Sequence, residues 1–196
     1  ASVYSLLSKI GSTVRSKHRG RWREKSCWTE PRKISFPPPV GRRRVYLYDV
    51  PSLDHFSRAY GVQTATFRMG LQLGLFNRVL GFLGWLHRIG RLKRPARYTG
   101  LLHMLSRRFR KWGDASYAIQ VQVLGTRGNQ EVSHSVTLVE AESEGLGIAT
   151  SLVITLVKRW MEIGVSEFGA VTAVGYVGLD DIKPELIRHD VKLVRA

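Results

Sequence analysis

The chain has 196 residues and a net charge of +16 at neutral pH, with 43% hydrophobic and 10% aromatic residues. This apolar content excludes a disordered basic tail, because such a chain can bury a core, and the length suits one domain better than two. The single cysteine, Cys27, excludes an internal disulfide and a multi-cysteine metal cluster. It also suits a reducing compartment, so we expect a cytoplasmic protein.

Positive charge is concentrated in the first part of the chain. Residues 1–113 contain 24 Lys/Arg and 4 Asp/Glu, a balance of +20, whereas residues 114–196 contain 7 and 11, a balance of −4. One interpretation is a surface that binds nucleic acid or an anionic membrane through counterion release. The other is a solvated face, or a face that meets an acidic partner. Cations and aromatic residues alternate, as in single-strand binders, at Arg19, Arg21, Trp22, Arg23, Lys25 and Trp28.

Residues 1–40 read as a basic lead-in to an α/β domain that covers residues 41–196. A short helix over residues 2–10 is followed by irregular chain to Lys33, with a hairpin around residues 21–28. The sequence FPPPVG at residues 36–41 predicts a stiff extended segment, because each proline fixes φ and disfavours helix at the residue before it.

Residues 44–69 predict a strand, a short helix and a second strand. The strands cover residues 44–50 and 62–69, and the helix begins at Pro51 and ends at Gly61. This order predicts a crossover between parallel strands of one sheet.

Two helices are predicted next, over residues 71–89 and, after a break, over residues 97–112. The apolar stretch at residues 71–86 is too short and too interrupted for a membrane span, although it suits an interfacial helix. Its glycines permit close approach by another helix or indicate a weakly encoded core helix.

The clearest pattern in the chain is a hairpin followed by a helix. Residues 117–123 and 132–138 alternate with period two around a Gly-containing loop. Residues 145–164 have the helical period and end at Gly164, which can adopt a left-handed conformation. The predicted buried face of this helix is Ala149, Leu152, Val153, Leu156, Val157 and Trp160.

The last part of the chain predicts a short strand or loop within residues 165–177, a helix over 179–189 and a strand over 191–194. Together these elements indicate an α/β (α+β) fold. We expect a mixed sheet with helices packed mainly on one face and an additional helical segment.

Two features near the hairpin are candidates for chemistry. Gly145, Gly147 and Thr150 follow a strand and open a helix, as a dinucleotide-binding loop does, but Thr150 replaces the third glycine. The acidic residues just before them would also repel a pyrophosphate, so a tight turn is the alternative. His134 lies on the apolar side of its strand and is either a hydrogen-bonded core histidine or a general acid/base.

Several stretches in order resemble the C-terminal part of saccharopine dehydrogenase-like oxidoreductases. They are FPPPVG leading into RRVYLYDVPSL, GVQTATFRMGL from Gly61, GLGIATSLVITLVKRW from Gly145, and LDDIKPELIRHD followed by VKLV near the end. The resemblance implies a substrate-binding and dimerisation domain for a small-molecule substrate. It also implies a homodimer and a Rossmann domain, expected upstream of Ala1, that binds NAD or NADP.

Under this resemblance the chain alone is inactive, and the substrate and the choice between NAD and NADP stay open. The candidate substrate-binding residues are His134, Gly145, Gly147 and Thr150, nominated from the turn where hairpin meets helix. The sequence identifies no catalytic residue and no metal ligand. The alternative function is a basic module that binds nucleic acid or an anionic membrane.

Overall fold

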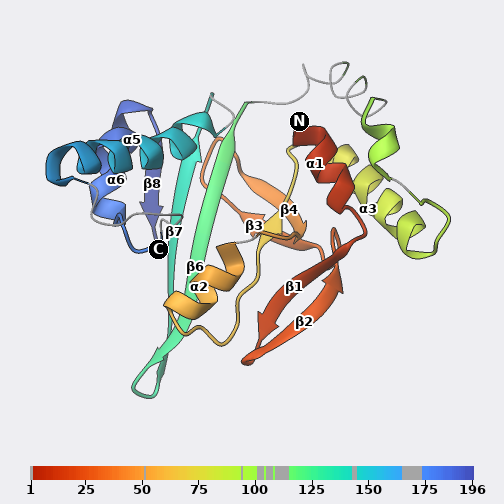
Figure 1. The fold of residues 1–196 in the computed structure, drawn as a ribbon, viewed down its shortest axis with the longest axis horizontal. Helices are drawn as coiled ribbons and strands as arrows, with labels where there is room; N and C mark the ends of the chain where they lie inside the picture. Colours follow the sequence, from red (N-terminus) through yellow and green to blue (C-terminus); the bar gives the residue numbers. More distant parts are fainter. Residues whose placement is uncertain are drawn as a thin grey trace. The chain divides into compact units, whose positions relative to one another are not determined.

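The computed structural model describes residues 2–50, 52–93, 95–100, 104, 108, 115–142, 145–164 and 174–196. It confirms a mixed α/β fold, with the strands divided among three small sheets rather than joined in one (Figure 1). The chain forms two compact units. We call residues 1–34 with 43–113 the N-terminal unit, and residues 35–42 with 114–196 the C-terminal unit.

The N-terminal unit begins with helix α1 (Ser2–Lys9) and a hairpin of β1 (Thr13–His18) and β2 (Arg21–Ser26). Arg19 and Gly20, both with positive φ, form the two-residue turn. The prediction of irregular chain here is wrong. The hairpin was hard to recognise because Val14 is the one apolar residue among the inward positions of β1, where Ser16 is also buried.

The next sheet contains β3 (Arg32–Ser35), β4 (Arg42–Leu47) and β5 (Arg68–Met69), in that order. Strands β4 and β5 are antiparallel, with Tyr46 opposite Met69, so the predicted parallel crossover is wrong. The intervening helix α2 (Ser52–Ala59) buries only Ser57 among its described residues, so it lacks the apolar face of a crossover helix. The predicted strand over 62–69 is reduced to β5 and a bridge at Ala65.

Helix α3 (Gly74–Arg88) confirms the helix predicted over 71–89, with a later start. The Asn77 side chain fixes that start, because it bonds both the N–H and the carbonyl of Leu71, at 2.9 and 2.7 Å. The 3₁₀ turn η1 (Pro95–Tyr98) follows. Most of the helix predicted over 97–112 lies outside the described residues.

Trp28 lies at the centre of the N-terminal core. Its ring stacks on Tyr46 with 5.2 Å between centroids, and its indole N–H donates to the Asn77 carbonyl at 3.1 Å. Its side chain therefore connects the end of the first hairpin to β4 and α3. Gly84 of α3 packs closely on Ile10, which favours close approach as the role of this glycine. The buried apolar cluster is Leu7, Ile10, Trp28, Tyr46, Phe76 and Leu80.

The C-terminal unit is built on the predicted hairpin, β6 (Tyr117–Arg127) and β7 (Gln130–Glu140), with β8 (Lys192–Arg195) paired to β7. Helices α5 (Leu146–Ile163) and α6 (Leu179–Arg188) complete it. Leu138 and Leu193 pair across the sheet and pack with residues of both helices, so these helices cover one face, as predicted. Of the strand or loop predicted within 165–177, residues 165–173 lie outside the described part of the chain.

The bounds of α5 are confirmed, but the predicted buried face is wrong. Its buried residues are Gly147, Ile148 and Ser151, whereas Val153 and Val157 on the predicted face are 58% and 44% exposed. Small residues face the sheet because the first turn of α5 packs closely on the end of β7. The more hydrophobic side of α5 is consequently left at the surface.

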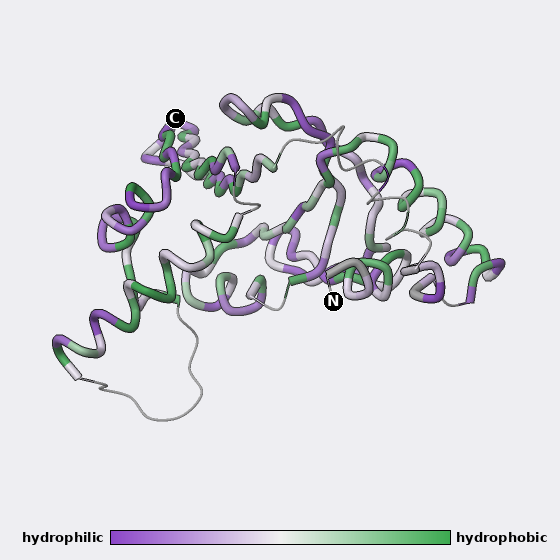
Figure 2. Tube along the Cα trace, turned by 90° about the horizontal axis from the view of Figure 1, so that it is seen from above, coloured by the Kyte–Doolittle hydropathy of each residue, from purple (hydrophilic) through white to green (hydrophobic). Residues whose placement is uncertain are grey.

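Hydrophobic and hydrophilic positions alternate along the helices, as the coloured trace shows (Figure 2). In the part of the chain that the structure describes, no helix has the length and the apolar content needed to cross a bilayer.

We expect Leu80→Ala to lower the free energy of unfolding by about 2–5 kcal/mol, because Leu80 is 1% exposed in the Trp28 cluster. Leu75→Ala is the matched control on the same helix, since Leu75 is 56% exposed. Denaturant unfolding followed by tryptophan fluorescence measures both. Equal losses for the two variants would contradict this assignment of the core.

Candidate functional site

The candidate residues nominated from the sequence lie in two separate parts of the C-terminal unit. Gly145 precedes α5, and Gly147 and Thr150 belong to its first turns. His134 lies on β7, six residues before Glu140, which corresponds to about 20 Å along a strand. Glu140 itself contacts Gly147, so the structure brings the three α5 residues together and leaves His134 apart.

The N-terminus of α5 is occupied by Glu140. The carboxylate accepts hydrogen bonds from the N–H groups of Gly147, at 3.0 Å, and Ile148, at 3.4 Å. Glu140 is 2% exposed, and its negative charge lies at the positive end of the helix dipole. A protein carboxylate therefore takes the position that a phosphate group would need, which favours a tight turn over a dinucleotide-binding loop.

The two glycines permit this close packing. Gly145 has φ of +85°, and a Cβ there would lie 2.6 Å from the Tyr117 ring. A Cβ on Gly147 would lie 2.6 Å from Glu140 Oε1 and 2.8 Å from His189 Cβ. Thr150 donates its hydroxyl hydrogen to the Leu146 carbonyl within the same helix, at 2.7 Å.

His134 is exposed, so the interpretation as a buried core histidine is wrong. It pairs with Val123 near the turn of the hairpin, whereas β8 pairs only with residues 136–139 of β7. The hairpin extends past the third strand, and His134 lies on the extension.

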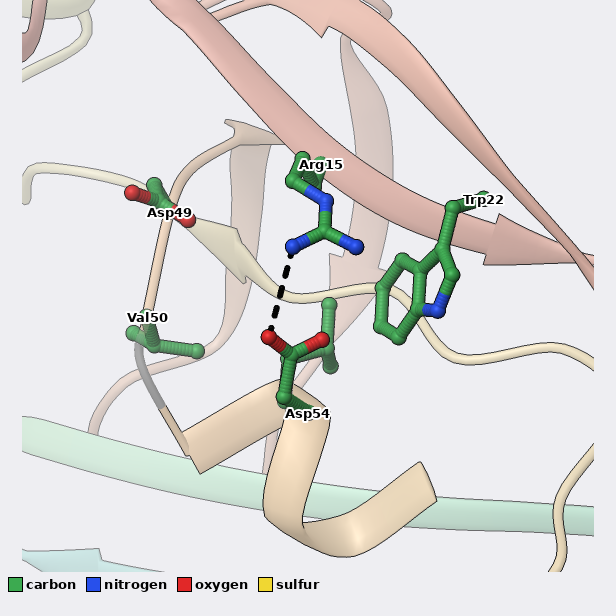
Figure 3. A pocket seen from close by; sticks show the side chains of 6 residues that line it. Arg15, Trp22, Asp49, Val50 and Asp54 are labelled. Carbon is green, nitrogen blue, oxygen red and sulfur yellow. Dashed lines mark hydrogen bonds and ion pairs between the residues drawn. The ribbon is translucent and has the colours of Figure 1, made fainter. Parts of the chain in front are cut away.

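A different site lies in the N-terminal unit, where β1, β2 and α2 line a shallow pocket of about 280 Å³. Figure 3 shows the Arg15 guanidinium joined to the carboxylate of Asp54, with the indole ring of Trp22 to one side. The remaining lining residues are Asp49, Val50 and Leu53. The pocket therefore combines one cation, two carboxylates, an aromatic ring and a small apolar surface.

Arg15 is held by two contacts. Its guanidinium carbon lies 4.7 Å from the centre of the Trp22 ring, a cation–π geometry, and its nitrogen lies 3.5 Å from Asp54. Alternation along β1 buries Val14 and Ser16 and directs Arg15 outward. Trp22 can meet it because Trp22 pairs with Lys17, the next residue of β1 on the same face.

The two carboxylates come from the segment that joins β4 to α2. Asp54 lies in the first turn of α2, where the helix dipole favours a negative charge. Asp49 pairs with Lys9 at 2.9 Å, and this hydrogen bond raises the pKa of Lys9 above its ordinary value. Each carboxylate thus has a cationic partner from the first fifteen residues of the chain.

The charged groups of the pocket are one guanidinium and two carboxylates, each of which has a partner of opposite charge within the protein. No three His, Cys, Asp or Glu side chains of the described residues lie together as a metal site requires. Cys27 is not a nucleophile in this state, because burial raises the pKa of its thiol to about 11 and the thiol donates to the Leu47 carbonyl.

The sequence analysis did not nominate the three charged residues or the tryptophan of the pocket, although a signal for the tryptophan was present. Trp22 belongs to the alternation of cations and aromatics at residues 19–28. The contact between Trp22 and Arg15 depends on the β1–β2 register, which the weak period-two pattern of these strands does not reveal. No protein-family model and no curated protein matches this chain.

We expect Glu140→Ala to destabilise the C-terminal unit by about 1–3 kcal/mol, because two buried N–H groups of α5 would lose their acceptor. Glu142→Ala, at an exposed position two residues later, is the control. Thermal unfolding by circular dichroism compares the two variants. If Glu140→Ala is as stable as the control, the carboxylate does not hold the helix.

Proposed function

We propose that this chain is the substrate-binding and dimerisation part of a saccharopine dehydrogenase-like NAD(P)-dependent oxidoreductase whose substrate is derived from an amino acid. The order of the resembling motifs supports the family. The observation that carries the substrate class is the pocket in which Arg15 faces Asp54 beside Asp49. In this proposal NAD or NADP binds a Rossmann domain in another part of the full-length protein, and the buried free thiol of Cys27 suits a cytoplasmic location.

The pocket offers complementary groups for both ends of an amino acid. A ligand carboxylate accepts hydrogen bonds from the planar guanidinium of Arg15, which can donate two in parallel. A ligand ammonium donates to Asp54 and Asp49, and the carbon skeleton lies against Val50 and Leu53. A volume of about 280 Å³ is small for a drug-sized ligand and adequate for an amino-acid head group.

A ligand can displace the internal ion pair at little cost. The side chains of Arg15 and Asp54 are 53% and 42% exposed, and their closest polar atoms are 3.5 Å apart. Exposed pairs of this kind contribute about 0–1 kcal/mol. Each partner can therefore exchange the other for a ligand group, while stacking on Trp22 keeps the guanidinium in place.

The proposed homodimer uses apolar surface of the C-terminal unit. Strand β6 is an edge of its sheet, and its first ten residues carry no charge, although native edge strands are usually protected by charge. The outer face of α5 also carries exposed apolar side chains. The exposed residues are Ile119, Val121, Val123, Leu152, Val153, Val157 and Trp160.

The nucleic-acid alternative gains less support from the aromatic residues. Trp28 is 3% exposed in the core, and one contact of Trp22 is already the Arg15 guanidinium. Lys25 is paired with Glu30. Base stacking on these rings is therefore not favoured, and the positive charge alone supports this alternative.

For the substrate pocket, we expect amino acids or secondary-amine amino-acid adducts to bind the chain and Arg15→Leu to weaken binding at least about tenfold, since a charge-assisted hydrogen bond is lost. Arg23→Leu, an exposed arginine of β2 outside the pocket, should leave affinity unchanged. Isothermal titration calorimetry measures both. Equal affinity for Arg15→Leu and the wild type would remove the pocket from the proposal.

For the dimer, we expect light scattering after size exclusion to give twice the chain mass of 22.2 kDa. Val121→Lys should shift the protein to the monomer, because it places a charge within the apolar row of β6. Val194→Lys on β8, at the other edge of the sheet, should not. A wild-type monomer at all concentrations contradicts dimerisation through this unit.

A further inference from the structure

Helix α3 has two apolar sides, and only one belongs to the core. Phe76, Asn77, Leu80 and Gly84 are buried. On the other side, Leu75, Phe82 and Trp85 of the helix and Ile89 at its C-cap are 56%, 57%, 45% and 44% exposed. We call these four residues the outer stripe of α3. Burial within the N-terminal unit does not account for them.

The residues of the outer stripe share one side of the helix, with Arg78 between Leu75 and Phe82. Their positions are separated by seven, three and four residues, which places them on one face of a 3.6-residue helix. Phe82 and Trp85 stack on each other with 5.8 Å between ring centroids. Protein surfaces normally carry large apolar residues singly, whereas the outer stripe has four of them on one side of the helix.

The charged residues close to the stripe in the sequence are all cationic. Residues 55–113 contain 12 Lys/Arg and no Asp or Glu. Arg78 is exposed on α3 among the stripe positions, and Arg88, Arg91 and Lys93 are exposed at and just beyond its C-terminal end. An apolar row with tryptophan and phenylalanine, bordered by arginine, has the composition of a helix that lies in a membrane interface.

We propose that the outer stripe of α3 docks on an anionic lipid bilayer, with the helix axis parallel to the membrane plane. Fifteen residues span about 22 Å, which is too short for a hydrocarbon core of about 30 Å, so the helix enters the interface without crossing it. The four apolar side chains enter the acyl boundary, and the arginines contact lipid phosphates.

The side chains of the outer stripe favour an anionic bilayer over nucleic acid as the partner of this surface. Leu75 and Ile89 offer no ring on which a base can stack, and both would remain exposed to water beside a phosphate backbone. A bilayer buries the aliphatic and aromatic residues of the stripe at the acyl boundary and presents negative charge to the arginines in the headgroup layer. The surface is distinct from the pocket of Arg15 and Asp54, so this inference goes beyond the proposed oxidoreductase function.

The test is flotation of the chain with vesicles of phosphatidylcholine alone and of phosphatidylcholine with phosphatidylserine. We expect binding to the anionic vesicles that weakens steeply with added salt, and little binding to the neutral ones. The double variant Phe82→Ser/Trp85→Ser should bind the anionic vesicles at least about tenfold more weakly, because two large apolar side chains leave the interface.

A second stacked aromatic pair supplies a matched control. Phe56 and Tyr60 on α2 are 46% and 61% exposed, with ring centroids 6.1 Å apart. Phe56→Ser/Tyr60→Ser should retain wild-type binding within about twofold. Circular dichroism checks the fold of both variants. Equal losses in the two variants would overturn the assignment to α3, and so would the absence of binding to anionic vesicles.

A charge variant keeps the proposal testable if the aromatic variant does not fold. Arg78→Glu/Arg88→Glu should lower vesicle binding at least about tenfold and reduce its dependence on salt, since each cation near an anionic surface contributes roughly fivefold. Unchanged vesicle binding in this variant overturns the proposal. So does tight binding of a single-stranded oligonucleotide that displaces vesicles and is insensitive to Phe82→Ser/Trp85→Ser.

Discussion

The N-terminal unit depends on the burial of Trp28. Its indole N–H donates to a carbonyl of α3, and its ring stacks on Tyr46 of β4, so one side chain fixes the position of three elements. A buried indole N–H without an acceptor costs a few kcal/mol, which makes this geometry specific as well as apolar. Because Trp28 follows β2 directly, it also fixes the hairpin that carries Arg15 and Trp22.

Both proposed binding surfaces follow from this packing. With one side of α3 directed at Trp28, the stripe with Phe82 and Trp85 must face outward. With the hairpin held against β4, Arg15 reaches Asp54 at the start of α2. Among the cations of the first 113 residues, Arg15 is paired in the pocket, whereas Arg78 and Arg88 lie beside an apolar stripe. These two environments suit different ligands, an amino acid and an anionic bilayer.

The C-terminal unit illustrates what the sequence could predict and what it could not. The ends of α5 were predictable because Gly145 and Gly164 adopt positive φ at its two boundaries, which is a local requirement. Which side of α5 is buried was not predictable from hydrophobicity, since Gly147 and Ser151 face the sheet. That choice depends on Glu140, whose carboxylate occupies the helix N-terminus and excludes larger side chains there. Glu140 accepts a hydrogen bond from a residue seven positions later, and a contact of this kind produces no periodic pattern in the sequence.

Long-range pairing limited the prediction in the N-terminal unit in the same way. The strand order around α2 suggested a parallel crossover, but β4 and β5 meet through only two residue pairs, in antiparallel register. Trp28 looked like a nucleic-acid contact because its neighbours in sequence are cationic, whereas its neighbours in space are Tyr46 and Asn77. The pocket and the stripe of α3 both result from contacts between residues more than thirty positions apart.

The most direct measurement is nicotinamide-dependent hydride transfer by the full-length protein, followed by absorbance of NADH and NADPH with secondary-amine amino-acid adducts as candidate substrates. We predict cofactor turnover with at least one such adduct and a raised KM in Arg15→Leu. A full-length protein that binds neither nicotinamide cofactor would contradict the proposed oxidoreductase function.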